Sequence, residues 1–115
     1  MSVKGEDIFM RLFVFFDLPV YKKEQRKIAT KFRKTLLKEG FTMLQFSVYC
    51  RCCRGQDIVN REIRRLKQIL PPEGNVRILQ VTEKQYGNMQ LLIGMPKKEE
   101  IIGSEQLLLF WIFIK

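Results

Sequence analysis

The chain has 115 residues, of which 46% are hydrophobic, and its 21 Lys+Arg against 12 Asp+Glu give a formal net charge of +9. This composition is typical of one folded domain and excludes a disordered basic tail. The absence of histidine excludes His-based triads, HExxH zinc sites and zinc fingers with imidazole ligands.

The first predicted element is a strand over residues 11–17. Its two faces are both apolar, as expected of a central strand covered on both sides, with Leu12, Val14 and Phe16 on one face and Phe13 and Phe15 on the other. Asp17 ends this strand, directly before Leu18-Pro19. Its carboxylate either orients the turn into the next element or binds a metal ion, and the strand pattern leaves both roles open.

A basic helix is predicted over residues 21–40, because apolar residues recur there at helical spacing up to Gly40. Five lysines step along it by four, four, three and four positions, and we call them the basic ridge: Lys23, Lys27, Lys31, Lys34 and Lys38. A solvated helix face is the simplest explanation of such a ridge. However, like charges at this spacing repel by about 0.2–0.5 kcal/mol per pair, which favours a polyanionic ligand such as a nucleic acid backbone. Arg26, Arg33 and Arg51 are further candidates for nucleic-acid binding.

Residues 43–51 alternate between apolar and polar side chains and predict a strand, unless this stretch bends into two short ones. Its outward face would carry Gln45, Ser47, Tyr49 and Arg51. Ser47 and Tyr49 are candidates for a subunit interface. The odd cluster of Cys50, Cys52 and Cys53 argues against a disulfide framework and for a reducing cytoplasm, and its side chains do not converge on a metal.

A second basic helix is predicted over residues 54–70, ending at Pro71-Pro72. The two helical segments carry net charges of +6 and +3, which together equal the whole net charge. Two more strands are predicted at residues 75–82 and 86–93, joined by a short polar turn at residues 83–85. The expected fold class is α+β: a ferredoxin-like two-layer sandwich over residues 9–94, an antiparallel sheet with two helices on one face.

This fold would leave the second sheet face uncovered, with Phe13 and Phe15 exposed, so a second subunit is expected to cover it. Residues 95–115 are predicted to be a linker followed by a strand at residues 107–114, which pairs with its own sheet or with that of the partner and places Leu108 and Phe110 at a dimer interface. That apolar run is too short for a membrane helix, which needs about 20 residues.

Asp17 is also the candidate for chemistry. A two-fold dimer packed through the sheets would bring two copies of Asp17 together and supply carboxylates for a shared Mg²⁺. Such an ion offers a chain without histidine a route to phosphodiester hydrolysis. Glycine-rich phosphate-binding motifs are absent from the sequence, which makes ATP use unexpected.

Several ordered motifs resemble the CRISPR-associated protein two family, in the versions found in type II systems. They are residues 15–19 (FFDLP), Phe32-Arg33, Gly40-Phe41, residues 45–49 (QFSVY), residues 71–77 (PPEGNVR) and Gln85-Tyr86. The resemblance implies a ferredoxin-like homodimer whose C-terminal strand joins the partner's sheet, with Asp17 as the Mg²⁺ ligand. It also implies a metal-dependent endonuclease acting on RNA or DNA, or a bridge that holds two dimers of the CRISPR integrase and a spacer-precursor duplex.

The sequence therefore predicts a CRISPR adaptation protein: a basic homodimeric scaffold for duplex DNA and the integrase, with an Mg²⁺-dependent nuclease site at Asp17. Two alternatives remain at this stage, a non-catalytic nucleic-acid-binding regulator of the same fold and a toxin-like endoribonuclease.

Overall fold

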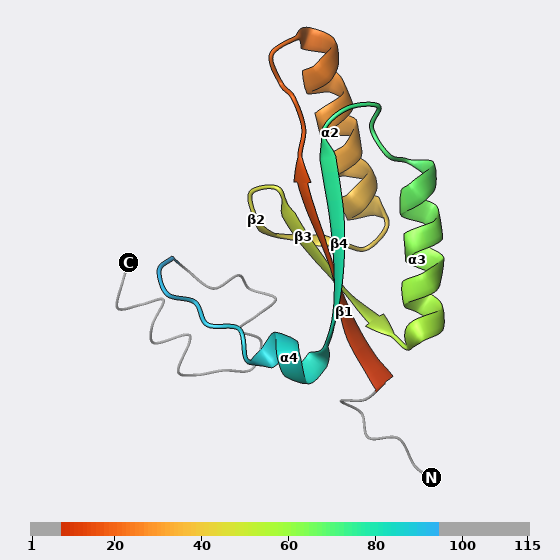
Figure 1. Cartoon of the computed structure of the whole chain (residues 1–115), viewed down its shortest axis with the longest axis vertical. Helices are drawn as coiled ribbons and strands as arrows, with labels where there is room; N and C mark the ends of the chain where they lie inside the picture. The colour runs from red at the N-terminus through yellow and green to blue at the C-terminus, as the bar shows by residue number, and fades with distance from the viewer. Residues whose placement is uncertain (1–7, 95–115) are drawn as a thin grey trace.

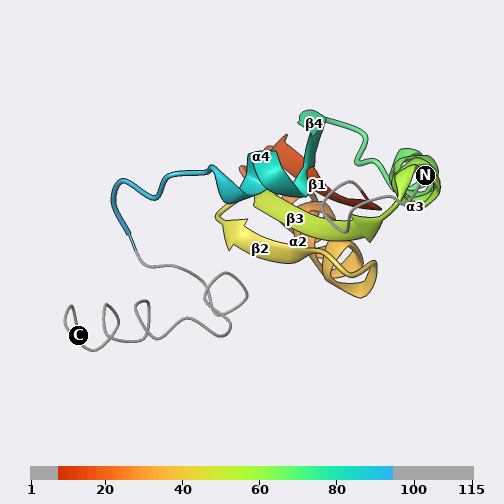
Figure 2. The ribbon, with the colours of Figure 1, turned by 90° about the horizontal axis from the view of Figure 1, so that it is seen from below.

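The structure is a computed structural model and describes residues 8–94. In chain order its elements are strand β1 (Phe9–Asp17), helix α2 (Lys23–Lys38), strands β2 (Thr42–Gln45) and β3 (Val48–Arg54), helix α3 (Gln56–Gln68), strand β4 (Asn75–Thr82) and the short helix α4 (Glu83–Gly87). The strands form one sheet in the order β2-β3-β1-β4, and all neighbouring pairs are antiparallel. Helices α2 and α3 lie on one side of this sheet and α4 on the other (Figure 1 and Figure 2). The predicted ferredoxin-like sandwich is confirmed.

The core lies between the sheet and helices α2 and α3. It is built from alternate residues of β1, two residues of β3 and the apolar stripes of both helices, together with one residue that follows α2: Leu12, Val14, Phe16, Phe32, Leu36, Phe41, Tyr49, Cys53, Val59 and Leu66. The rings of Phe16 and Phe32 meet edge to face with centroids 5.1 Å apart. The central strand is thus fixed to α2 close to its own end at Asp17.

Helix α2 ends where the sequence predicts. Gly40 has a φ of +94°, a conformation that glycine adopts without a Cβ penalty. The backbone N–H groups of Gly40 and Phe41 then donate to the carbonyls of Leu37 and Leu36, at 3.1 and 3.0 Å, which satisfies two carbonyls at the helix end. The chain can therefore reverse directly into β2.

The predicted strand over residues 43–51 is interrupted by a turn at Phe46 and Ser47, so the alternative of two short strands is correct. Ser47 has a φ of +63°, and its carbonyl accepts a hydrogen bond from the Phe16 backbone N–H at 3.1 Å. The turn reverses which residues of β3 face the helices. Tyr49 pairs with Val14 on the helix side, and its ring stacks on Phe16 with centroids 5.6 Å apart. The predicted outward orientation of Tyr49 and Arg51 is therefore wrong.

The strand predicted over residues 86–93 is also wrong. Residues 83–87 form α4 instead, because Thr82 and Gln85 make reciprocal bonds at its start. The Gln85 backbone N–H donates to Thr82 Oγ1 at 3.0 Å, and the Thr82 backbone N–H donates to Gln85 Oε1 at 2.9 Å. Within residues 8–94 the sheet consequently has four strands.

The linker and strand predicted over residues 95–115, with Leu108 and Phe110, lie outside the described residues. Among the residues that the structure does describe, none of the helices has the length and apolar character needed to cross a membrane.

Candidate nucleic-acid interface and metal site

The basic ridge lies along one exposed side of α2. Its five lysines line a shallow groove of about 530 Å³ together with Arg26, Thr30 and Thr35. The helical repeat explains this grouping, because residues three and four apart project from the same side of a helix. The structure thus brings together all five lysines that the sequence spacing singles out.

The three candidate arginines have different surroundings. Arg26 lines the same groove, and its Nη1 donates to the carbonyls of Val20 and Tyr21 at 3.0 and 3.1 Å. This contact fixes the loop that leads into α2.

Arg33 points away from the groove. Its guanidinium lies over the rings of Phe46 and Phe16, with 5.2 and 6.0 Å between Cζ and the ring centroids.

Arg51 lies under α3 instead of on an exposed strand face. It forms an ion pair with Glu62, whose side chain is 1% exposed. Arg61 Nη2 and Arg65 Nη1 lie 3.8 and 3.6 Å from the same Glu62 oxygen. The structure therefore contradicts the exposed position from which the nucleic-acid role of Arg51 was predicted, because the guanidinium pairs with a buried carboxylate.

The role of Glu62 was not predicted, although the sequence carries a signal for it. Glu62 lies three residues after Val59 and four before Leu66, which places it on the buried stripe of α3. A carboxylate on an apolar stripe requires a cation.

Asp17 is exposed and ends β1 on the same side of the strand as Phe13 and Phe15. It borders a depression of about 300 Å³, lined also by residues of the 46–47 turn and of β4, among them Phe46, Ser47, Asn75 and Arg77. Asn75 is the partner of Asp17 across the β1–β4 pair, and Arg77 is the partner of Phe15. One carboxylate, one amide and one guanidinium therefore face the same space.

Gly74 makes this arrangement possible. It has a φ of +96°, and a Cβ there would lie 2.6 Å from the carbonyl oxygen of Asp17 and 2.9 Å from Leu18 Cδ2. Only glycine lets the chain enter β4 this close to the end of β1.

A metal ion could use the oxygen donors of this depression, since Mg²⁺ takes one or two carboxylates and completes its shell with water and phosphate oxygens. Within residues 8–94 no cluster of three or more His, Cys, Asp or Glu side chains is arranged to hold a metal. Asp17 supplies the one carboxylate of this lining, and Asn75 and Ser47 add neutral oxygen donors, a set that is chemically compatible with partial coordination of a magnesium ion.

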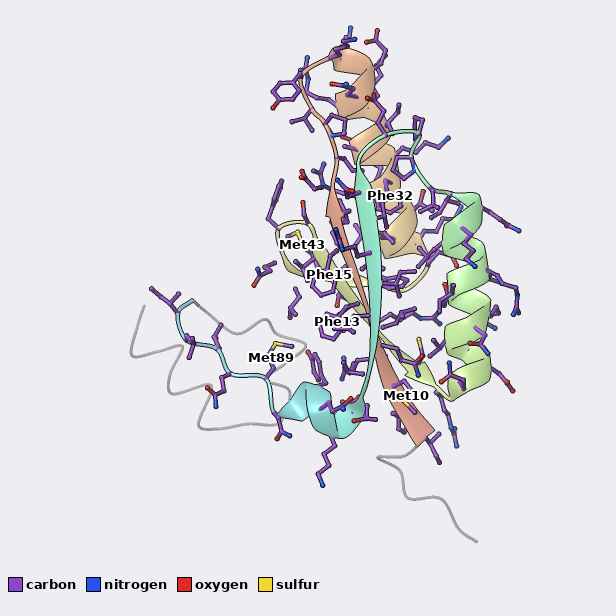
Figure 3. The ribbon with its side chains drawn as sticks, viewed as in Figure 1. Met10, Phe13, Phe15, Phe32, Met43 and Met89 are labelled. Carbon is purple, nitrogen blue, oxygen red and sulfur yellow. The ribbon has the colours of Figure 1, made fainter. Side chains whose placement is uncertain are left out.

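Two of the interface candidates, Phe13 and Phe15, lie on the sheet side opposite α2 and α3, as Figure 3 shows, whereas Phe32 lies toward the helices. Phe13 is only 5% exposed, because Phe15 and Tyr86 of α4 both pack on it with centroids 5.9 Å away. Phe15 is half-buried and borders an apolar groove of about 310 Å³, with Leu44, Val48, Leu79, Val81 and Met89. Ser47 is half-buried beside Asp17. Tyr49 is in the core, away from this face.

Helix α4 is held on the sheet by Arg11. The guanidinium donates to both carboxylate oxygens of Glu83, at 2.9 and 3.0 Å, and lies 4.2 Å from the centroid of the Tyr86 ring. The hydrogen bonds from Arg11 to Glu83 raise the pKa of Arg11 above its already high ordinary value. The ion pair thus holds Tyr86 of α4 over Phe13, an arrangement that was not predicted from the sequence.

The three cysteines are all free thiols. Cys50 and Cys52 pair with Phe13 and Arg11 on one side of β3, and Cys53 lies in the core on the other, as predicted. Burial raises the pKa of Cys50 to about 11 and also raises the pKa values of Cys52 and Cys53. All three are therefore protonated at neutral pH and are poor nucleophiles.

An antiparallel β2-β3-β1-β4 sheet with two helices on one face defines a ferredoxin-like protein. A family model described as CRISPR associated protein Cas2 matches residues 10–89. The chain is 48% identical over 102 residues to the CRISPR-associated endoribonuclease Cas2 of Acidovorax ebreus, which covers 88% of this chain and 100% of that protein. It is also 48% identical over 100 residues to the protein of the same name from Campylobacter jejuni, which covers 87% of this chain and 70% of that protein. A solved structure titled "Crystal structure of cas2" shares the fold, with a TM-score of 0.54 and 24% identity, covering 78% of this chain and 92% of that one. The chain belongs to the Cas2 family.

Proposed function

We propose that this chain is a homodimeric scaffold of CRISPR adaptation that carries duplex DNA along α2 and bridges dimers of the CRISPR integrase. The observation that carries this proposal is the placement of all five ridge lysines in one groove. Duplex DNA has a phosphate charge about every 1.7 Å along its axis, and each phosphate neutralised by a lysine releases condensed counterions. A dimer presents the ridge twice, which suits a duplex held between two integrase dimers.

The dimer is proposed to form through the sheet side that carries Phe15. The groove there is apolar and is rimmed by Leu79 and Met89, which are 51% and 48% exposed. Burying such surface in a second copy is favourable by about 25 cal/mol per Å². Residues 95–115 are proposed to add a linker and a strand that pairs with the partner's sheet.

A metal-dependent endonuclease activity at Asp17 is the second part of the proposal. The two Cas2 relatives are named endoribonucleases, and RNA is accordingly a proposed substrate beside DNA. Asp17 lies on the same side of β1 as Phe15, so packing the sheets face to face brings the two copies of Asp17 toward the subunit boundary.

In that arrangement the two copies of Asp17 would together hold one shared Mg²⁺ ion, which when bound supplies a water of lowered pKa and stabilises charge on the phosphoryl oxygens. The chain itself contributes Arg77, an exposed cation able to pair with the phosphate next to the scissile bond.

The decisive experiment has two parts, co-purification of the chain with the CRISPR integrase and a spacer-integration assay. Both are carried out with wild type and with Asp17→Asn. We expect the variant to lose Mg²⁺-dependent cleavage and to keep integrase binding and integration. Asp57→Asn is the matched control, since it removes an acidic charge in the first turn of α3, away from the depression. Loss of integration in Asp17→Asn alone would make the carboxylate essential to adaptation, and failure to co-purify with the integrase would reject the scaffold.

A further inference from the structure

Phe46 is a large apolar side chain with an unusual position. It is 76% exposed, lies at the tip of the turn between β2 and β3, and borders the same depression as Asp17. A single exposed apolar residue is common on protein surfaces and by itself indicates nothing. The surroundings of this ring are what make it informative.

One contact to the ring and two features of the turn fix its position. The Arg33 guanidinium lies over it with 5.2 Å between Cζ and the ring centroid. Ser47, the next residue, holds the turn in a left-handed conformation with a φ of +63°. The Ser47 carbonyl accepts a hydrogen bond from the backbone N–H of Phe16, which directly precedes Asp17. The turn is thus tied to the end of β1, and the ring is held beside the carboxylate.

Two cations lie near the ring against the single carboxylate of Asp17, a balance that favours an anionic ligand. Arg77 lines the depression on the β4 side, and Arg33 lies against the ring itself. An aromatic ring with one guanidinium over it and a second lining the same depression matches the chemistry of a nucleotide, whose base stacks on the ring while its phosphates pair with the cations.

We propose that Phe46 forms a base-stacking subsite for an unpaired nucleotide next to Asp17, with Arg77 binding the adjoining phosphate. This inference rests on the proposed nuclease site and names the side chain that would hold an unpaired base there. In a duplex the faces of the bases are covered by their neighbours, so an aromatic platform selects bases that are free to stack. Duplex DNA on the basic ridge needs no such platform.

The test measures binding without cleavage, using the full chain with Asp17→Asn, by fluorescence anisotropy. The ligands are a short single-stranded RNA, the DNA of the same sequence, a fully abasic strand of equal length and a duplex. A stacked base contributes about 1–3 kcal/mol by alanine substitution, and about 1.4 kcal/mol is tenfold in affinity. Phe46→Ala should therefore weaken binding of the single strands by about fivefold to 150-fold and leave binding of the abasic strand and the duplex within about twofold of the parent. Phe46→Trp, which keeps an aromatic ring at this position, should bind the single strands as the parent does. The RNA and DNA arms show which sugar the subsite prefers.

Tyr21→Ala is the matched control, because Tyr21 is another exposed aromatic residue, at 90%, and lies outside the Asp17 depression. It should bind all four ligands as the parent does. The inference is overturned if Phe46→Ala binds the single strands like the parent or if Tyr21→Ala loses as much affinity. A Phe46→Ala chain that sediments as a smaller species than the parent also overturns it, since Phe46 would then be a contact between copies.

The two proposals fail separately. If wild type and Asp17→Asn cleave alike while Phe46→Ala loses single-strand binding, the nuclease assignment is rejected and the stacking subsite stands.

Discussion

Arg51→Ala tests whether the guanidinium of Arg51 stabilises the fold through Glu62 or binds nucleic acid. Glu62 is 1% exposed, and Arg51 is its closest cation. Removing one partner of a buried ion pair costs about 3–5 kcal/mol, because the remaining charge is left buried. Arg61 and Arg65 stay within 4 Å of Glu62 but are themselves 42% and 51% exposed, so they offset part of this cost. We expect a loss of about 2–3 kcal/mol in the free energy of unfolding, or about 10–20 °C in Tm for a domain of this size.

Urea denaturation at pH 7 measures this loss, and two variants sharpen it. Arg54→Ala, on the same strand but exposed, should change the free energy of unfolding by less than about 0.5 kcal/mol. Replacing Arg51 and Glu62 together by methionine should restore most of the stability, because no buried charge then remains. Below its Tm, Arg51→Ala should bind duplex DNA as wild type does. A loss of less than about 0.5 kcal/mol together with weaker DNA binding would refute this reasoning and return Arg51 to the nucleic-acid interface.

Three further predictions concern the ridge, the thiols and the depression. Lys31→Ala should reduce the slope of log affinity against log salt for duplex DNA by about 0.9, the value of one phosphate contact, and an unchanged slope would exclude Lys31 from the interface. An alkylating reagent at pH 8 should modify Cys52 before Cys50, as mass spectrometry can follow. The pKa of Cys50 is about 11 in the folded chain against an ordinary 9.0, so this thiol ionises first in the unfolded chain. The free energy of unfolding should therefore fall as pH rises from 9.0 to about 11. Equal labelling of the two thiols, or no such fall, would contradict this. Gly74→Ala should lower the free energy of unfolding by about 1–2 kcal/mol, because alanine is strained in the left-handed backbone conformation of this position. The new Cβ should also displace the Asp17 carbonyl and so reduce cleavage more than duplex binding. Equal losses in the two assays would argue against a local effect.

The parts of the fold that follow from the sequence are those in which one periodicity runs without interruption. The apolar run ending at Asp17 identified the central strand, and the 3.6-residue repeat placed the whole basic ridge on one side of α2. The sequence resemblance then supplied the family, since the motif order is specific even where each motif is short.

The misassigned parts are those in which a local contact overrides the periodicity. Residues 86–93 were predicted as a strand, but the capping box of Thr82 and Gln85 starts a helix that includes the first two of them. The salt bridge from Arg11 to Glu83 then fixes that helix on the sheet. Contacts between residues 72 positions apart cannot be read from a local pattern.

The turn at Ser47 has consequences for both the core and the site. Because it reverses the orientation of β3, Tyr49 enters the core and Arg51 reaches Glu62, while Val48 joins Phe15 on the open side of the sheet. The charge of Arg51 therefore neutralises Glu62 inside the fold and is not offered to a ligand. The five lysines of the basic ridge, which are exposed along α2, remain available to a polyanion. The same turn holds Phe46 beside Asp17. The left-handed conformation of Ser47 thus underlies the two separate binding sites proposed for this chain. One binds the phosphates of a duplex along α2, and the other binds an unpaired base at the end of β1.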